Sequence, residues 1–165
     1  MPTKKENIQR LKRNEEKWTK PMMAAGWTVI PSIILEKQHA LGLDAVDVNI
    51  LLQLARHWWY KDNPPYPSKS TIAECMRIDR STVRRHIAEM EKAGFIKRQS
   101  RYNGQHGGQA TNIYRFDGLI KLATPFAQEA VKTREERRNE DTVRLRRKKP
   151  VTGSTPASSS ATGEK

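Results

Sequence analysis

The sequence predicts a mainly helical domain that carries a small antiparallel β hairpin, and three observations lead to this fold class. Ser68 and Asp79 each stand where an N-cap residue would begin a short helix, with only a tight turn between the two helices. Two strand-like segments, 95–100 and 112–116, enclose a stretch with three glycines, which is typical of a hairpin. A longer apolar segment, 44–60, precedes them and can form the core on which both short helices pack.

Changes in composition divide the 165-residue chain into four segments. Residues 1–26 carry seven Lys and Arg against three Asp and Glu, and predict a basic flexible arm with little order. Residues 27–120 hold the apolar pattern of one domain. Residues 121–149 predict a charged C-terminal helix with Glu140–Arg144 at a stabilising spacing, and 150–165, rich in small and polar residues, predict a disordered tail. The apolar residues expected to dock on the domain after the hairpin are Leu119, Ile120, Leu122, Phe126, Ala130 and Val131.

The first half of the domain predicts one short strand and two helices. Residues 27–30 predict a short strand that Pro31 closes, and Ser32 is expected to cap a helix that ends near Leu41 and Gly42. Asp44, with a second aspartate three residues on, is expected to cap a helix that runs to about Tyr60. Apolar residues surround most of the axis of this helix, which makes it either the central strut of the domain or partly a subunit interface. These residues are Val46, Ile50, Leu51, Leu52, Leu54, Ala55, Trp58 and Trp59.

A helix, a turn, a second helix and a hairpin then follow in direct succession. The loop 63–67 holds three prolines and cannot be helical, so Ser68 begins the first short helix. The second helix is expected from Arg80 to about Ala93, and Gly94 ends it where a left-handed residue is wanted. Its inward face is predicted by the spacing of Val83, Ile87 and Met90. This order of elements is that of a winged helix-turn-helix, whose second helix enters the major groove of DNA.

The positive charge of the chain is concentrated on these elements. The net charge is +13, and residues 77–101 carry eight basic against three acidic residues, whereas 27–76 have a net charge of −1. Solubility needs no such concentration, but binding to a phosphate backbone does. Double-stranded DNA is therefore the expected partner.

Other classes of protein are disfavoured by what the sequence lacks. No run of 18 apolar residues predicts a membrane span, and the charged N-terminus does not resemble a signal peptide. The single cysteine, Cys75, fits a reducing cytoplasm and is expected to be a small buried residue of the first short helix. The four histidines show no metal-ligand spacing with Cys75, and no catalytic set or phosphate-binding loop is found. We therefore expect no enzyme activity, no cofactor and a cytoplasmic protein associated with the nucleoid.

Residues 67–96 resemble the DNA-binding segment of GntR-type regulators and align with it without a gap. The fragments that carry the resemblance are Pro67-Ser68, Ile72-Ala73, Ser81-Thr82-Val83-Arg84-Arg85 and Gly94-Phe95-Ile96. The wider pattern over 27–120 is also similar to helix-turn-helix modules of phage and plasmid replication proteins. The resemblance implies that Arg80, Ser81, Thr82 and Arg84 contact bases and phosphates.

This chain departs from the GntR-type pattern at three points. Ser70 stands where a phosphate-binding arginine is common, and Arg77 replaces the turn glycine, so a non-glycine residue is expected in the left-handed region. GntR-type regulators carry a large effector-binding domain after the hairpin, whereas here the residues after Phe116 are too polar to enclose a ligand. No small-molecule effector is therefore expected. The complete set of expected DNA-binding residues is Lys69, Ser70, Arg80, Ser81, Thr82, Arg84, Arg85, Arg101, Asn103, Gln105 and His106.

The expected function is sequence-specific binding of double-stranded DNA by a transcriptional regulator, with the second helix in the major groove and the hairpin on the adjacent backbone or minor groove. A homodimer is expected, because one module gives a small interface and regulators usually pair half-sites. Two alternatives stay open. One is a replication initiation protein of a mobile element, and the other is a winged-helix adaptor that docks on proteins, which the charge of 77–101 disfavours.

Overall fold

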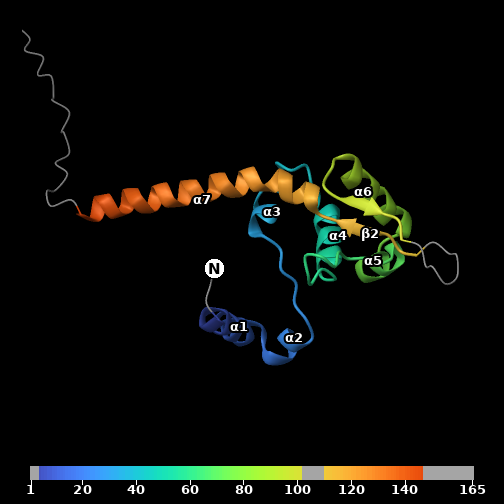
Figure 1. Ribbon diagram of the computed structural model, residues 1–165, viewed down its shortest axis with the longest axis horizontal. Helices are drawn as coiled ribbons and strands as arrows, with labels where there is room; N and C mark the ends of the chain where they lie inside the picture. The colour runs from blue at the N-terminus through green and yellow to red at the C-terminus, as the bar shows by residue number, and fades with distance from the viewer. Residues whose placement is uncertain (1–3, 102–109, 147–165) are drawn as a thin grey trace, which may run out of the picture. The chain divides into compact units, whose positions relative to one another are not determined.

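The computed structural model describes residues 4–101 and 110–146 and is mainly helical, with one two-stranded antiparallel sheet (Figure 1). Contacts within the chain divide it at residue 127 into two compact units. None of the described helices is both long and apolar enough to cross a membrane. The elements are α1 Lys4–Trp18, α2 Lys20–Ala24, α3 Ser32–Glu36, α4 Ala45–Ala55, α5 Lys69–Met76, α6 Arg80–Lys92, β1 Lys97–Gln99, β2 Ile113–Arg115 and α7 Asp117–Arg146.

Helix α4 is the central strut of the first unit, as one of the two sequence interpretations held. It contacts both α5 and α6, and α5 and α6 contact each other (Figure 1). Apolar residues on several sides of α4 are fully buried because each side meets a different neighbour. The core that results joins α4 to the two short helices and to the residues around the hairpin. Its most buried members are Ile50, Leu51, Leu54, Ile72, Val83, Ile87, Met90 and Tyr114.

The caps that the sequence predicted determine how α5 and α6 begin and end. The Ser68 hydroxyl accepts a hydrogen bond from the Thr71 backbone N–H at 3.0 Å, which satisfies a free donor in the first turn of α5. Arg77 ends this helix in the left-handed region, with φ 53° and ψ 46°, as expected from the missing glycine. Asp79 is the N-cap of α6, without a side-chain cap bond, and Gly94 follows the helix with φ +80°. The helix-turn-helix geometry therefore follows from local sequence.

The hairpin is attached to both ends of the helix-turn-helix unit. Its strands pair with Arg98 opposite Tyr114. The Tyr114 backbone N–H donates to the Pro65 carbonyl at 2.9 Å, and Arg98 forms an ion pair with Glu91 at the end of α6. The hairpin strands are thus held against the loop before α5 and against the second helix. The loop residues 102–109 lie outside the described residues.

Three expectations about the first half of the domain are wrong. Residues 27–31 form no strand, because no neighbouring described segment pairs with them and Val29 is exposed. Helix α3 begins at Ser32 after the N-cap Pro31, so Ser32 is not the cap, and the helix ends at Glu36 rather than near Gly42. Helix α4 ends at Ala55 rather than near Tyr60. It ends early because Trp58 turns inward and stacks on Phe116, with ring centroids 5.1 Å apart.

Helices α1 and α2 replace the little order expected of the N-terminal segment. The 15 residues of α1 contain neither glycine nor proline and are mostly Lys, Arg, Glu, Gln and Asn, of which all but Asn favour helix. Local propensity therefore outweighs the absence of a strong apolar face. Trp18 at its end is exposed.

Helix α7 is one continuous helix that begins at Asp117, four residues before the charged helix predicted for 121–149. Of the residues expected to dock on the domain, Leu119 is buried, whereas Ile120, Leu122 and Val131 are exposed, because the helix buries only a narrow stripe completed by Ala123. In the C-terminal part Arg144 pairs with Asp141 at 3.4 Å rather than with Glu140. The i,i+3 neighbour lies on the same helix face and competes with the i+4 neighbour.

Candidate nucleic-acid interface

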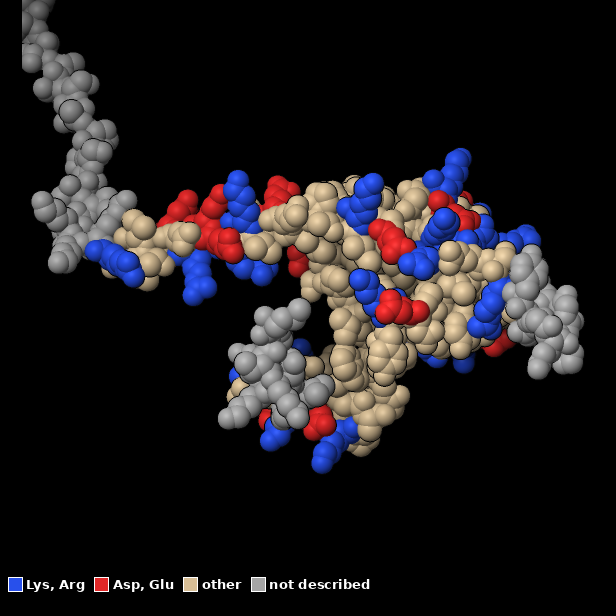
Figure 2. Space-filling model, viewed as in Figure 1, with Lys and Arg blue, Asp and Glu red and all other residues tan. Residues whose placement is uncertain are grey.

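The outer face of α6 carries most of the predicted site residues. Arg80, Ser81, Arg84 and Arg85 are exposed, and Thr82 is half-buried beside them. The opposite face of the helix is buried in the core through Val83, Ile87 and Met90. Residues three and four apart share a helix face, so these exposed side chains form one stripe over the first half of the helix. In Figure 2, Lys and Arg side chains recur along the part of the domain where Figure 1 places α5, α6 and the hairpin.

Lys69, in the first turn of α5, lies among cations from two other elements. Its pKa is lowered first by partial desolvation and then by the charges of Arg98, Arg80 and Arg84. The charge of Glu91 acts in the other direction and raises the pKa of Lys69, but Arg98 already engages this carboxylate. The lowered pKa shows that these positive charges repel one another when no counter-ion is bound. Such a cluster attracts an anion, which would relieve the repulsion.

A shallow polar cavity of about 300 Å³ lies beside this cation cluster. It is formed by the N-terminal turn of α5, the first residue of α6 and the approach to β2. The cavity is lined by Pro67, Ser68, Lys69, Ser70, Arg80, Ala110, Thr111, Asn112 and Tyr114. Lys69 and Ser70, both half-buried, were expected from the sequence, and the structure brings them together with Arg80. Hydroxyls, a lysine, an arginine and the N-terminus of a helix are groups that bind phosphate oxygens.

A buried hydrogen bond between His86 and Asp47, which the sequence did not predict, joins α6 to α4. His86 Nδ1 lies 2.8 Å from Asp47 Oδ1, and both side chains are largely buried. Because a carboxylate can only accept, Nδ1 carries the proton of this hydrogen bond. Arg85 Nη2 lies 3.4 Å from Nε2 of the same ring. The ring of His86 thus contacts Asp47 on one side and the guanidinium of Arg85, a predicted DNA-binding residue, on the other.

Asp44, Asp47 and His86 have ligand atoms within 4.8 Å of one another, a spacing that a metal ion could use. The two aspartates, however, form a reciprocal capping box at the start of α4. Asp47 N donates to Asp44 Oδ1 at 2.7 Å, and Asp44 N donates to Asp47 Oδ2 at 3.1 Å. Asp47 Oδ1 is engaged by His86. These carboxylates already satisfy protein donors, so we assign the cluster to the α4–α6 contact.

Of the four hairpin residues predicted to bind DNA, the structure describes one, Arg101. Arg101 is half-buried, and its guanidinium stacks over the ring of Tyr66, 4.3 Å from the ring centroid. Asn103, Gln105 and His106 lie outside the described residues. Their expected DNA contacts stay predictions, and the stacked Arg101 would have to leave Tyr66 to reach a base.

Cys75 is exposed, contrary to the expectation of a small buried residue. Helix α5 turns Ile72 and Ala73 inward, and Cys75 lies on the outer side of the same helix. Its sulfur is 3.8 Å from Arg56 Nη1. The few apolar residues of α5 predicted that one face of the helix is buried, but they are too few to show on which side of that face Cys75 lies.

The α5–turn–α6 unit followed by the hairpin defines a winged helix-turn-helix, a fold class that binds DNA through its second helix. Residues 41–96 match the family model described as "Helix-turn-helix domain", which covers both helices of the motif and confirms the prediction from the sequence. No curated protein matches the chain.

Three solved structures are similar to this chain at low sequence identity. The N-terminal domain of DnaD protein from Geobacillus kaustophilus HTA426 is 15% identical, over 75% of this chain and 96% of that chain, with a TM-score of 0.49. A possible transcriptional regulator from Methanosarcina mazei Go1 is 18% identical, over 70% and 88%, with a TM-score of 0.39. The transcriptional regulator SlyA is 20% identical, over 70% and 80%, with a TM-score of 0.37.

Proposed function

We propose that this protein binds double-stranded DNA in a sequence-specific manner, with α6 in the major groove. The observation that carries the proposal is the exposed stripe of Arg80, Ser81, Arg84 and Arg85 on α6, next to a polar cavity whose lining includes Lys69 and Arg80. A helix that is buried on one side and cationic on the other is suited to a groove lined by phosphates.

The two parts of this surface have different roles in the proposal. Arg84 and Arg85 face outward from the first half of α6, where a guanidinium can bind the O6 and N7 atoms of guanine with two hydrogen bonds. Lys69 and Arg80 line the polar cavity and hold a backbone phosphate, which determines the register of the helix on the duplex. The buried His86–Asp47 pair keeps the helix in a fixed orientation on α4 while it binds.

We propose a transcriptional regulator that acts as a homodimer. A single module buries a small area on DNA, and two modules related by a two-fold axis read two half-sites one helical turn apart. Initiation of replication would use the same DNA-binding surface. The position of the bound sites distinguishes the two roles, because regulator sites lie at promoters and initiator sites cluster at an origin.

The proposal is tested by selecting fragments of the source genome on the full-length protein and then measuring binding to the selected site by fluorescence anisotropy. Arg84→Ala or Arg85→Ala should weaken binding to that site by about 1–3 kcal/mol and reduce discrimination at one base position. Lys92→Ala is the matched control, since it removes one exposed positive charge from the same helix roughly 12 Å further along its axis. It should have a small effect that does not depend on sequence.

Two results would contradict the proposed function. One is an absence of any preferred sequence in the selection. The other is equal loss of affinity in Arg84→Ala, Arg85→Ala and Lys92→Ala with unchanged base discrimination, which would mean that α6 supplies only diffuse charge. Each variant must keep the far-UV circular dichroism spectrum of the parent protein.

A further inference from the structure

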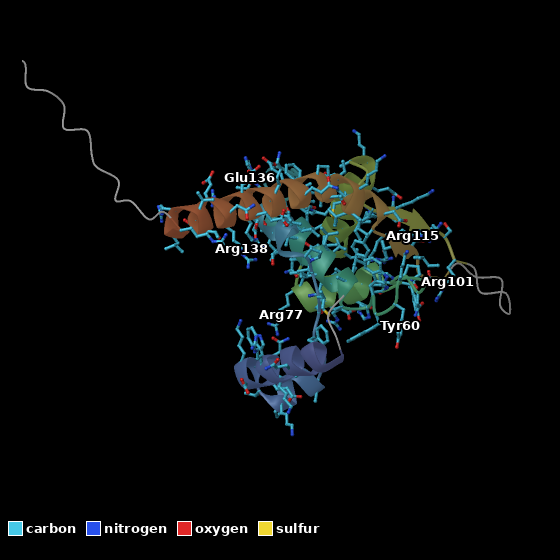
Figure 3. All side chains as sticks on the ribbon, turned by 60° about the vertical axis from the view of Figure 1, so that its left-hand side comes forward. Tyr60, Arg77, Arg101, Arg115, Glu136 and Arg138 are labelled. Atoms are coloured by element: carbon cyan, nitrogen blue, oxygen red, sulfur yellow. The ribbon has the colours of Figure 1, made fainter. Side chains whose placement is uncertain are left out.

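An exposed apolar surface lies apart from the α6 face and is not used by the proposed function. A cavity of about 400 Å³ opens between the turn that follows α4, strand β2 and the first turn of α7. Its apolar lining, which we call the aromatic patch, consists of Trp58, Trp59, Tyr60, Pro64, Phe116 and Ile120. Two of the residues that line the cavity, Tyr60 and Arg115, are labelled in Figure 3.

The aromatic patch combines a rigid floor with exposed aromatic side chains. Trp58 and Phe116 stack with an interplanar angle of 8° and form the floor. Trp59 and Tyr60 are 62% and 74% exposed, and Ile120 is 51% exposed. Large aromatic side chains that stay exposed around a preformed cavity mark a protein contact surface more often than a solvated one.

The charged rim of the aromatic patch is balanced. The cavity is lined by two basic residues, Lys61 and Arg115, and two acidic residues, Asp62 and Asp117. Arg115 Nε pairs with Asp117 Oδ2 at 2.8 Å. The pKa of the Arg115 guanidinium is raised by the hydrogen bond and charge of Asp117 and, to a smaller extent, by Asp62. This rim is neutral on a chain whose net charge is +13, and its two carboxylates oppose contact with phosphate.

We propose that the aromatic patch is the surface through which two copies of this chain associate, which rests on the homodimer proposed above and names its interface. Two copies repel each other over most of their surface because each carries a charge of +13, so a neutral surface is where they can meet. Neighbouring charges of opposite sign make the rim self-complementary about a two-fold axis, with Lys61 of one copy beside Asp62 of its partner.

Two other observations favour a second copy as the occupant. The C-terminal residues 150–165 contain one large apolar residue, Val151, and cannot fill a cavity lined by aromatic rings. Helix α6 contributes no residue to the lining, so association here leaves both recognition helices available for DNA.

The test measures the mass of the full-length protein by sedimentation equilibrium over the micromolar range, without DNA. The unsubstituted chain should dimerise, and Trp59→Ser should raise the dissociation constant at least about tenfold. Trp18→Ser is the matched control, because Trp18 is a tryptophan of similar exposure, 53%, in α1, and this substitution should leave association unchanged. A monomer throughout the range, or equal association of the two variants, would overturn the proposal.

A charge exchange tests the two-fold arrangement without removing any apolar contact. Lys61→Asp alone should weaken the dimer, and Lys61→Asp combined with Asp62→Lys should restore it, because each pair is then re-formed with the signs reversed. Failure of the double variant to recover would count against this interface. Oligothymidylate that quenches tryptophan fluorescence in the parent but not in Trp59→Ser would identify a base-stacking surface instead and reject the dimer interface.

These measurements are separable from the test of DNA binding. Trp59→Ser should keep the base preference of a single module on a half-site while it loses affinity for a paired site. If the chain binds no preferred DNA yet dimerises through Trp59, the proposed function is wrong and the interface stands. If it binds its preferred DNA as a monomer, the interface and the homodimer are wrong, and the proposed sequence-specific DNA binding stands.

Discussion

Removal of His86 should destabilise the domain more than removal of the exposed His39 or His57. The ring bonds Asp47 at 2.8 Å, and the two side chains are 7% and 13% exposed. Removal of the ring leaves the Asp47 carboxylate buried without this partner, and the loss of one partner from a buried hydrogen bond typically costs about 1–3 kcal/mol, and more where the remaining group is charged. Asp47 keeps its bond to the Asp44 backbone through the capping box, so we expect His86→Ala to lower the free energy of unfolding by about 3 kcal/mol.

The measurement is urea unfolding followed by circular dichroism, with His57→Ala, at an exposed histidine, as the control. A double-mutant cycle of His86→Ala with Asp47→Ala isolates the pairwise contribution. We expect a coupling free energy above about 1 kcal/mol between the two residues. A cost of His86→Ala equal to that of His57→Ala, or additive single effects, would show that packing and not the His86–Asp47 hydrogen bond holds α6 on α4.

Four further predictions concern charge, packing and the C-terminal segment. The hydrogen bond from Arg98 lowers the pKa of Glu91, so this residue stabilises the fold above its ordinary pKa of 4.5, and the stabilisation is lost as the pH falls through the lower folded-state pKa. Glu91→Gln should therefore make the unfolding midpoint less dependent on pH in the acidic range. DNA phosphate should raise the lowered pKa of Lys69, so calorimetry at alkaline pH in two buffers of different ionisation enthalpy should detect proton uptake on binding that Lys69→Met abolishes. A Cβ at Gly118 would lie 1.8 Å from a backbone oxygen, so Gly118→Ala should lower stability by at least about 2 kcal/mol in thermal unfolding. Truncation after Thr133 should weaken binding to all DNA sequences about equally and reduce the slope of log K against log salt, whereas loss of site preference would contradict the assignment of α6.

The parts of the fold that could be predicted from the sequence are those determined by interactions between residues close together in the chain. Ser68 and Gly94 delimit the two short helices through local backbone requirements, and the periodicity around Val83 predicts which face of α6 is buried. The exposed arginines of the site follow directly from that periodicity. The bounds of α4 were predicted less well, because Trp58 fits a helical apolar pattern and yet leaves the helix to stack on a residue near the other end of the domain.

The contact between Asp47 and His86 could not be predicted from local sequence. The two residues are 39 positions apart, and each has an ordinary local explanation, one as the capping-box partner of a helix start and the other as a polar residue of a basic helix. Only the crossing of α4 and α6 brings them together. The one feature of the sequence that could have indicated the contact is the position of His86. It lies next to the buried Ile87, on a helix whose basic residues were predicted to face outward.

The left-handed conformation of Arg77 has a consequence for how this turn can change. Glycine would adopt the same backbone angles without steric cost, whereas a side chain there costs about 1 kcal/mol or more. Arg77→Gly is therefore a substitution that should raise the melting temperature while it removes a cation from between the two helices of the motif. The positive charge of the turn is therefore carried by a strained backbone conformation, and the gain in melting temperature of Arg77→Gly would report the size of that strain.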